Sequence, residues 1–139
     1  MIMRSLLLLL AILATVHVSA SNKLPGEKIL QVTVNEVGIV TVGRDTVNAD
    51  NLSKYIQERL FKSYMGTGHM HSKIKFVKAN DNVPDLVIDV VLKEIHDGQQ
   101  RALTELCLEK YKNFFDKIEK RKQDKLKKQF PVLFQSNYL

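Results

Sequence analysis

The sequence predicts an α+β fold: a small sheet, mixed or mostly antiparallel, with two helices on one face and an extra basic helix near the C-terminal end. Two observations predict this class. Segments in which apolar residues alternate, as in half-buried strands, occur between segments with apolar residues at helical spacing. In residues 79–98, which read ANDNVPDLVIDVVLKEIHDG, turn-forming residues and Pro84 separate a strand-like segment from a helix-like one. We interpret this stretch as a strand-to-helix corner.

The first twenty residues have the features of a secretory signal peptide. Arg4 supplies a positive charge, residues 6–16 are almost all apolar, and Val18-Ser19-Ala20 places small residues where a signal peptidase cleaves. This apolar run is shorter than the roughly 20 residues that span a bilayer. We therefore expect cleavage after about Ala20 and a periplasmic or secreted protein, with an uncleaved inner-membrane anchor as the alternative.

Composition indicates one domain with a basic end. The chain has 139 residues and a formal net charge of +6, and residues 117–128 hold seven of its lysines and arginines. Cys107 is the only cysteine, which excludes an intrachain disulfide. The apolar core must therefore stabilise the fold by itself.

Residues 28–42 predict a β-hairpin that follows a linker at residues 21–27. Apolar and β-branched residues alternate on both sides of the turn-forming residues 35–38. Gly38 can adopt the positive φ that such a turn needs. A break in the strand pattern is expected at residues 43–45.

A first helix is predicted over residues 49–64, where apolar residues recur at helical spacing. Asn48 or Asp50 can accept a hydrogen bond as its N-cap. The helix is expected to stop at Gly66-Thr67-Gly68. Alternation in KIKFVK, residues 73–78, then predicts another strand.

A second helix is predicted to start at about Pro84 and to end at Gly98. Its apolar spacing predicts four buried positions: Leu86 or Val87, Val90, Val91 and Ile95. Residues 101–106, which read RALTEL, fit either a short last strand or the opening of a longer helix, because Ala, Leu and Glu favour a helix and Thr does not.

A basic amphipathic helix is predicted over residues 107–130, followed by a tail at residues 131–139. Its apolar stripe consists of Leu108, Tyr111, Phe115 and Ile118. This stripe is a candidate docking surface for a partner protein or a second copy of the chain, and it could equally cover the open face of its own sheet. The charged end of the helix is expected to lie in solvent.

The order of these elements resembles the periplasmic domain of the ExbD/TolR family of biopolymer-transport proteins. The resemblance covers residues 28–106 and is carried by six pieces of the chain: the hairpin 31–42, the helix after Val47, the strand 74–77, the corner 79–84 with its A-x-D-x-V-P pattern, the helix through Val90-Val91-Leu92, and RALTEL in the place of the family's last strand. In the family an Asp usually follows the Ala, whereas here Asn80 follows Ala79 and the acid is Asp81.

The resemblance implies a non-catalytic adaptor that acts through protein–protein contacts. ExbD/TolR proteins are commonly dimeric and work with a membrane proton channel in TonB- or Tol-type transport across the cell envelope. They carry a transmembrane helix with a proton-coupling aspartate, and residues 6–16 of this chain contain no acid. The resemblance therefore implies the periplasmic domain alone, with envelope proteins of a TonB/Tol-type system as partners and no cofactor.

Two histidines suggest an alternative function. His69 and His71, with Met70 between them, could bind copper, nickel or zinc, because histidines at i and i+2 in a strand point the same way. A stable site needs further ligands, and His96 is the only other histidine outside the first twenty residues. The alternative reading is a secreted or periplasmic protein that binds a metal or another small ligand.

Enzyme activity has no motif to support it. Asp85 and Asp89 lie one helical turn apart, which is typical of a solvated helix face, and Cys107 has no surrounding nucleophile motif. There is neither a glycine-rich phosphate loop nor a nucleophile elbow. We therefore predict that the protein is not an enzyme.

The basic residues near the C-terminal end are candidates for contact with an anionic surface. The four that we single out are Lys120, Arg121, Lys122 and Lys125. Export argues against nucleic acid and favours phospholipid head groups, lipopolysaccharide or acidic cell-wall peptides. A solvated helix end with mixed charges is the simpler reading.

Overall fold

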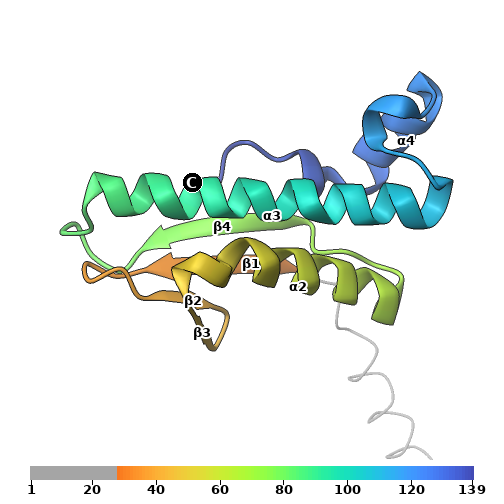
Figure 1. Cartoon of the computed structure of the whole chain (residues 1–139). Coiled ribbons are helices and arrows are strands. Elements are labelled where there is room, and N and C mark those ends of the chain that lie inside the picture. Colours follow the sequence, from red (N-terminus) through yellow and green to blue (C-terminus); the bar gives the residue numbers. More distant parts are fainter. Residues whose placement is uncertain (1–27) are drawn as a thin grey trace, which may run out of the picture.

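A four-stranded mixed sheet lies at the centre of the computed structural model, which describes residues 28–139 (Figure 1). The strands are β1 (Ile29–Val34), β2 (Val40–Val42), β3 (Asp45–Val47) and β4 (Lys73–Lys78), in the order β3-β2-β1-β4. β1 pairs with β2 antiparallel and with β4 parallel. The predicted α+β class is therefore confirmed.

The turn between β1 and β2 forms as the sequence predicts. Asn35 accepts hydrogen bonds from the backbone N–H groups of Val37 and Ile39 through Oδ1, and Gly38 has a φ of 84°. The predicted break after β2 is a second tight turn, in which Gly43 has a φ of 61°, as the first central position of a type II′ turn requires. β3, which follows this turn, was not predicted, because three residues are too few to show a period.

The first helix, α2 (Leu52–Thr67), lies close to its predicted place and is preceded by the short 3-10 helix η1 (Ala49–Asn51). Asn48 caps η1 by accepting a hydrogen bond from the N–H of Asp50. At the other end, Gly68 has a φ of 74° and donates to the carbonyl of Tyr64, which is the expected glycine stop.

The second helix, α3 (Asp85–Tyr111), does not end at Gly98, so the predicted stop is wrong. A Cβ atom at Gly98 would lie 2.6 Å from Cβ of Ile56 and 2.8 Å from the carbonyl oxygen of Ser53. The glycine therefore allows α3 to approach α2 closely. Residues 101–106 continue this helix and are not a last strand.

Burial along α3 also differs from the prediction. Val91 and Ile95 are buried as expected, whereas Val90 is 47% exposed and Leu86 is 75% exposed. Val87, the alternative to Leu86, is partly buried against the core. The helix continues to bury residues beyond Gly98, among them Gln99, Ala102, Leu103 and Leu106.

The predicted helix over residues 107–130 is broken in the structure. α3 ends at Tyr111 because Lys112 adopts the left-handed conformation, with a φ of 55°. A short 3-10 helix, η2 (Phe115–Lys117), follows, and then the basic helix α4 (Lys120–Gln129). Asn113 and its neighbours therefore turn the chain where an unbroken helix was expected.

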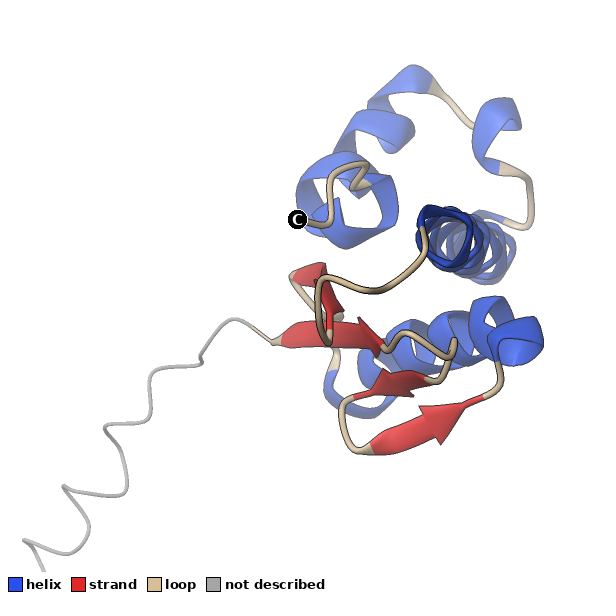
Figure 2. Ribbon diagram, turned by 90° about the vertical axis from the view of Figure 1, so that its left-hand side faces the viewer, coloured by secondary structure: helices blue, strands red, loops and turns tan. Residues whose placement is uncertain are grey.

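Helices α2 and α3 lie on one face of the sheet (Figure 2). Alternate side chains of every strand point into the layer between sheet and helices, where they meet the buried side chains of the helices. The buried sheet residues are Leu30, Val32, Val34, Val40, Val42, Val47, Ile74 and Phe76. None of the helices within residues 28–139 is both long enough and apolar enough to cross a bilayer. The predicted signal peptide lies outside the described residues.

The tail after α4 finds its partner within the chain. The 3-10 helix η3 (Pro131–Phe134) buries Val132 and Leu133, and the following residues lie along the free edge of β4. Phe76 donates its N–H to the carbonyl of Tyr138 at 2.8 Å. The side chain of Gln135 bonds both backbone groups of Ile74, at 2.8 and 2.7 Å. This edge of the sheet is therefore covered.

A buried polar network fixes the tail to α3. Gln99, which is fully buried, donates from Nε2 to the carbonyls of Val132 at 2.6 Å and Gln135 at 3.1 Å. Its Oε1 accepts a hydrogen bond of 2.5 Å from the hydroxyl of Tyr138. Each polar atom of the Gln99 side chain thus has a partner, as a buried amide requires.

Candidate binding surfaces

The apolar stripe predicted on a C-terminal helix is not one surface. Leu108 lies on α3 and is 41% exposed, whereas Tyr111, Phe115 and Ile118 are partly buried against the core of their own chain. The ring of Phe115 lies 5.4 Å from that of Phe134, centroid to centroid. The break at Lys112 separates the members of the stripe. Most of this stripe therefore packs against the core of its own chain.

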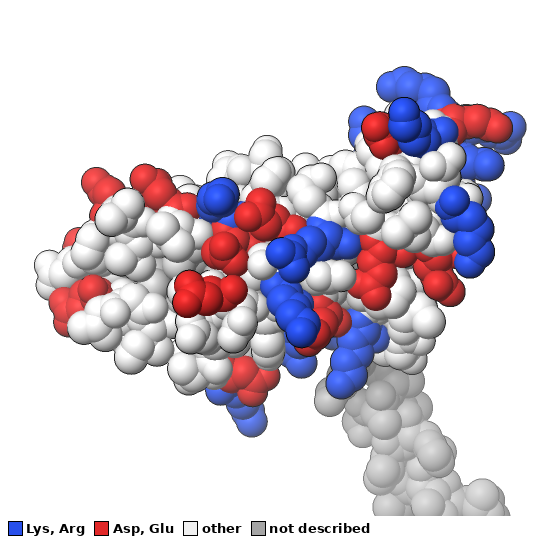
Figure 3. Space-filling view, viewed as in Figure 1, with Lys and Arg blue, Asp and Glu red and all other residues white. Residues whose placement is uncertain are grey.

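The basic residues of α4 form an exposed positive end of the molecule (Figure 3). Of its ten residues only Leu126 is buried, so the helix presents most of its surface to solvent. Lys122 points back toward α3, with Nζ 5.2 Å from the centroid of the Tyr111 ring. The four lysine and arginine residues that we predicted as an anionic-surface site therefore do not share one face.

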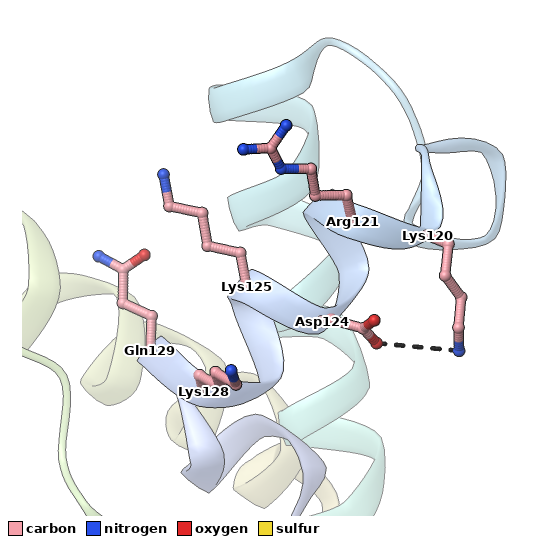
Figure 4. Close-up of a pocket in the computed structure, with 6 residues that line it drawn as sticks. All are labelled: Lys120, Arg121, Asp124, Lys125, Lys128 and Gln129. Atoms are coloured by element: carbon pink, nitrogen blue, oxygen red, sulfur yellow. Dashed lines mark ion pairs between the residues drawn. The ribbon is translucent and has the colours of Figure 1, made fainter.

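Within α4, one row of basic residues lies on a common side. Figure 4 shows Arg121 and Lys125 pointing the same way from successive turns, while Lys120 lies on the other side of the helix. Lys120 forms an ion pair of 3.8 Å with Asp124. A single convex helix cannot surround a ligand, so this row is suited to contact with a flat anionic surface.

The two predicted metal ligands lie in different environments. His69 is exposed, whereas His71, just before β4, is only 6% exposed. No group of three or more His, Cys, Asp or Glu side chains within residues 28–139 could hold a metal ion. The cavity that His71 lines also contains Lys28 and Arg59, and these cations oppose a metal cation. Within the described part of the chain, His69 and His71 therefore have no third ligand of this kind beside them.

Burial shifts the pKa of the His71 ring and the pKa of the Cys107 thiol. The pKa of His71 is lowered to about 4, first by burial and then by the charges of Lys28 and Arg59. Nδ1 of the ring is buried and has no hydrogen-bond partner among residues 28–139. Burial also raises the pKa of the Cys107 thiol, so the thiolate needed for nucleophilic attack is disfavoured.

An exposed apolar patch, which the sequence did not predict, lies at the end of the molecule opposite α4. It combines the hairpin turn and the first turns of α3, and its exposed members are Val37 (74%), Ile39 (49%), Leu86 (75%) and Val90 (47%). We call these residues the hairpin–α3 patch. An apolar cavity of about 230 Å³ beside it is lined by Gly38, Ala49, Leu86, Val87, Val90 and Val91.

Acidic residues surround this patch. Glu36 precedes Val37 in the turn, and Asp85 and Asp89 flank Leu86 and Val90 on α3; all three acids are exposed. In Figure 3, the end of the molecule at the start of α3 shows mostly red and white atoms, while blue atoms gather over α4. The two ends therefore differ in both polarity and charge.

The sequence could have signalled the patch through one feature. Leu86 and Val90 are four residues apart and thus share a face of α3. This spacing is the same whether the helix face packs on the sheet or extends past the edge of the sheet.

Comparisons with protein-family models, curated proteins and solved structures gave no significant match for this chain.

Proposed function

We propose that the protein is a non-catalytic adaptor of the cell envelope, similar to the periplasmic domain of ExbD/TolR proteins, and that it binds another protein through the hairpin–α3 patch. The exposure of Leu86 and Val90 at an apolar cavity, together with the exposed apolar residues of the hairpin turn that contributes Gly38 to it, supports this proposal. The order hairpin, α2, β4, corner and α3 agrees with the resemblance. The last strand that the resemblance implies is not formed, because α3 continues through residues 101–106.

The charges around the patch favour a particular partner. Glu36, Asp85 and Asp89 would attract lysine or arginine residues that flank an apolar segment of the partner. A second copy of the chain, bound through the same patch by two-fold symmetry, would place these acids against their own equivalents. The partner is therefore an apolar, basic-flanked segment of a different envelope protein.

Site-specific photo-crosslinking in the native cells tests the proposal. A photoreactive residue at Val37 should crosslink to one envelope protein, and the same residue at Leu108, an exposed apolar position outside the patch, should not. Crosslinking to a second copy of the chain, or an equal yield at both positions, would contradict the proposed partner.

Binding by purified proteins gives the energetic test. With the crosslinked partner in hand, the double substitution Leu86→Ser and Val90→Ser should weaken binding by about tenfold or more, because it removes buried apolar area at the centre of the contact. Leu108→Ser on the same helix is the matched control and should leave the affinity unchanged. Both sites are exposed, so neither variant should lose its fold.

The proposed location has its own test. Export with cleavage after about Ala20 predicts that the protein isolated from its native compartment has the mass of residues 21–139. A mass that includes the first twenty residues would instead support the uncleaved anchor, and recovery from the cytoplasm would contradict an envelope function.

A further inference from the structure

A second cavity lies at the opposite end of α2 from the hairpin–α3 patch. It has a volume of about 240 Å³ and is formed by the C-terminal half of α2 and the segments just before β1 and β4. Its lining residues are Lys28, Arg59, Lys62, Ser63, Thr67 and His71. We propose that this cavity, which we call the α2 basic cavity, binds a phosphate-type oxyanion.

The arrangement of exposed and buried residues has the form of a binding site. Ser63 and His71 are buried at the base of the cavity, with exposed fractions of 9% and 6%, whereas Lys28, Arg59 and Lys62 are exposed around it. A ligand can thus reach the cations from solvent. Arg59 and Lys62 are three residues apart on α2, so they lie on neighbouring positions of one helix face.

Charge gives the cavity its selectivity. Three cationic side chains line it and no carboxylate does. Within residues 28–139, no carboxylate forms an ion pair with Lys28, Arg59 or Lys62. Positive charges around one cavity, with no counter-charge from the described residues, create a positive potential that attracts an anion. A phosphate oxyanion suits this set, because its oxygens can accept from a guanidinium and from two ammonium groups at once.

Hydrogen bonds hold one of these cations and the wall of the cavity in place. Nζ of Lys28 donates to the hydroxyl of Ser63 at 2.9 Å, and that hydroxyl donates to the carbonyl of His69 at 3.0 Å. Thr67 also bonds the backbone of His69. The cavity is therefore preorganised by contacts between α2 and the loop before β4.

His71 provides a second, independent indication of a ligand. Its side chain is more than nine-tenths buried in the lining, and Nδ1 has no hydrogen-bond partner within the described part of the chain. Buried polar atoms of side chains normally have partners, so an orphaned ring nitrogen in a cationic cavity calls for an explanation. An oxyanion would offset the positive charge of Lys28 and Arg59 around the ring.

Nuclear magnetic resonance of the full chain with inorganic phosphate tests the proposal. Phosphate should shift the ring signals of His71 saturably, and not those of the exposed His96. The double substitution Arg59→Gln and Lys62→Gln should weaken binding by about tenfold or more, since it removes two charge-assisted contacts. The matched control, Lys54→Gln and Lys93→Gln, makes the same charge change at exposed positions outside the cavity and should leave binding unchanged.

The source of the phosphate group is distinguished with vesicles. Phosphatidic acid in phosphatidylcholine vesicles should bind the wild type more tightly than the cavity variant if the ligand is a lipid head group. Phosphate binding without a cavity-dependent vesicle contribution would assign a free phosphate or phosphate ester. The proposal is overturned if His71 shows no saturable shift, or if the control pair loses as much affinity as the cavity pair while both retain the wild-type melting temperature.

Discussion

The sheet layer, which comprises β1–β4, α2 and α3, is held together differently from the C-terminal layer, residues 112–139. In the sheet layer, α2 and α3 meet closely at Gly98 and interlock apolar side chains above the strands. In the C-terminal layer, α4 buries only Leu126, and the tail is positioned by hydrogen bonds to Gln99 and to the edge of β4. Close apolar packing therefore sets the distance between elements in the sheet layer, while in the C-terminal layer polar bonds align a tail that also buries apolar residues of η3.

The largest effect is expected from Gly98→Ala. The new methyl group would meet Ile56 and the backbone of Ser53 at under 3 Å, so the helices must separate. We expect the free energy of unfolding to fall by about 2–4 kcal/mol in urea denaturation, despite the better helix propensity of Ala.

Gly66→Ala is the control for this substitution. Gly66 lies within α2 and a Cβ there would meet nothing within 4 Å. We expect this change to raise the free energy of unfolding by up to about 1 kcal/mol. Equal losses for the two variants would show that helix contact at Gly98 is not what distinguishes the sheet layer.

Gln99→Leu should affect the C-terminal layer first. The substitution keeps the volume of the side chain but leaves the carbonyl of Val132 and the hydroxyl of Tyr138 without this partner. We expect a loss of about 2–3 kcal/mol, because unsatisfied buried polar groups are costly. Limited proteolysis should cut residues after Lys112 well before it cuts α2, and simultaneous cleavage of both regions would contradict the separation into layers.

Acid should destabilise the sheet layer through His71. Its pKa is lowered to about 4 in the fold, so the unfolded chain binds more protons below a pH of about 6.5. The contribution of the neutral His71 ring to the free energy of unfolding is therefore fully present above that pH and is lost as the pH falls toward about 4. Between pH 7 and pH 5 the expected loss is about 2 kcal/mol.

Urea denaturation at the two pH values measures this loss. His71→Gln should remove most of the difference, and His96→Gln, at an exposed position of α3, should keep it. An identical pH dependence in both variants would exclude His71 as the cause.

The smallest effect on stability is expected from α4. Arg121→Glu with Lys125→Glu should change the free energy of unfolding by no more than about 0.5 kcal/mol, because both side chains are exposed. The same pair should reduce binding to anionic vesicles in a flotation assay at low salt. Unchanged vesicle binding would remove α4 as an anionic-surface site.

Local patterns predicted most of the sheet layer. The alternation of apolar and polar residues identified β1, β2 and β4, and the glycines after the apolar run identified the end of α2. Gly98 was misread because a glycine after an apolar run favours a helix end, whereas the reason for this glycine is the neighbouring Ile56. That reason is tertiary and has no local signature.

The candidate sites were harder to predict for the same reason. The α2 basic cavity joins Lys28, Arg59 and His71, which come together only because β1 and β4 pair in parallel beside α2. The hairpin–α3 patch depends on where α3 passes the end of the sheet. The sequence contained the histidine of the cavity but suggested a metal for it, since the neighbouring cations come from other parts of the chain.

The covered edge of β4 has a consequence for the order of events during synthesis. Ile74 bonds to a glutamine 61 residues later in the chain, and Phe76 bonds to Tyr138. The strand edge therefore stays open until residues up to Tyr138 have left the ribosome. Because such long-range contacts form slowly, the edge of β4 is expected to close late in folding.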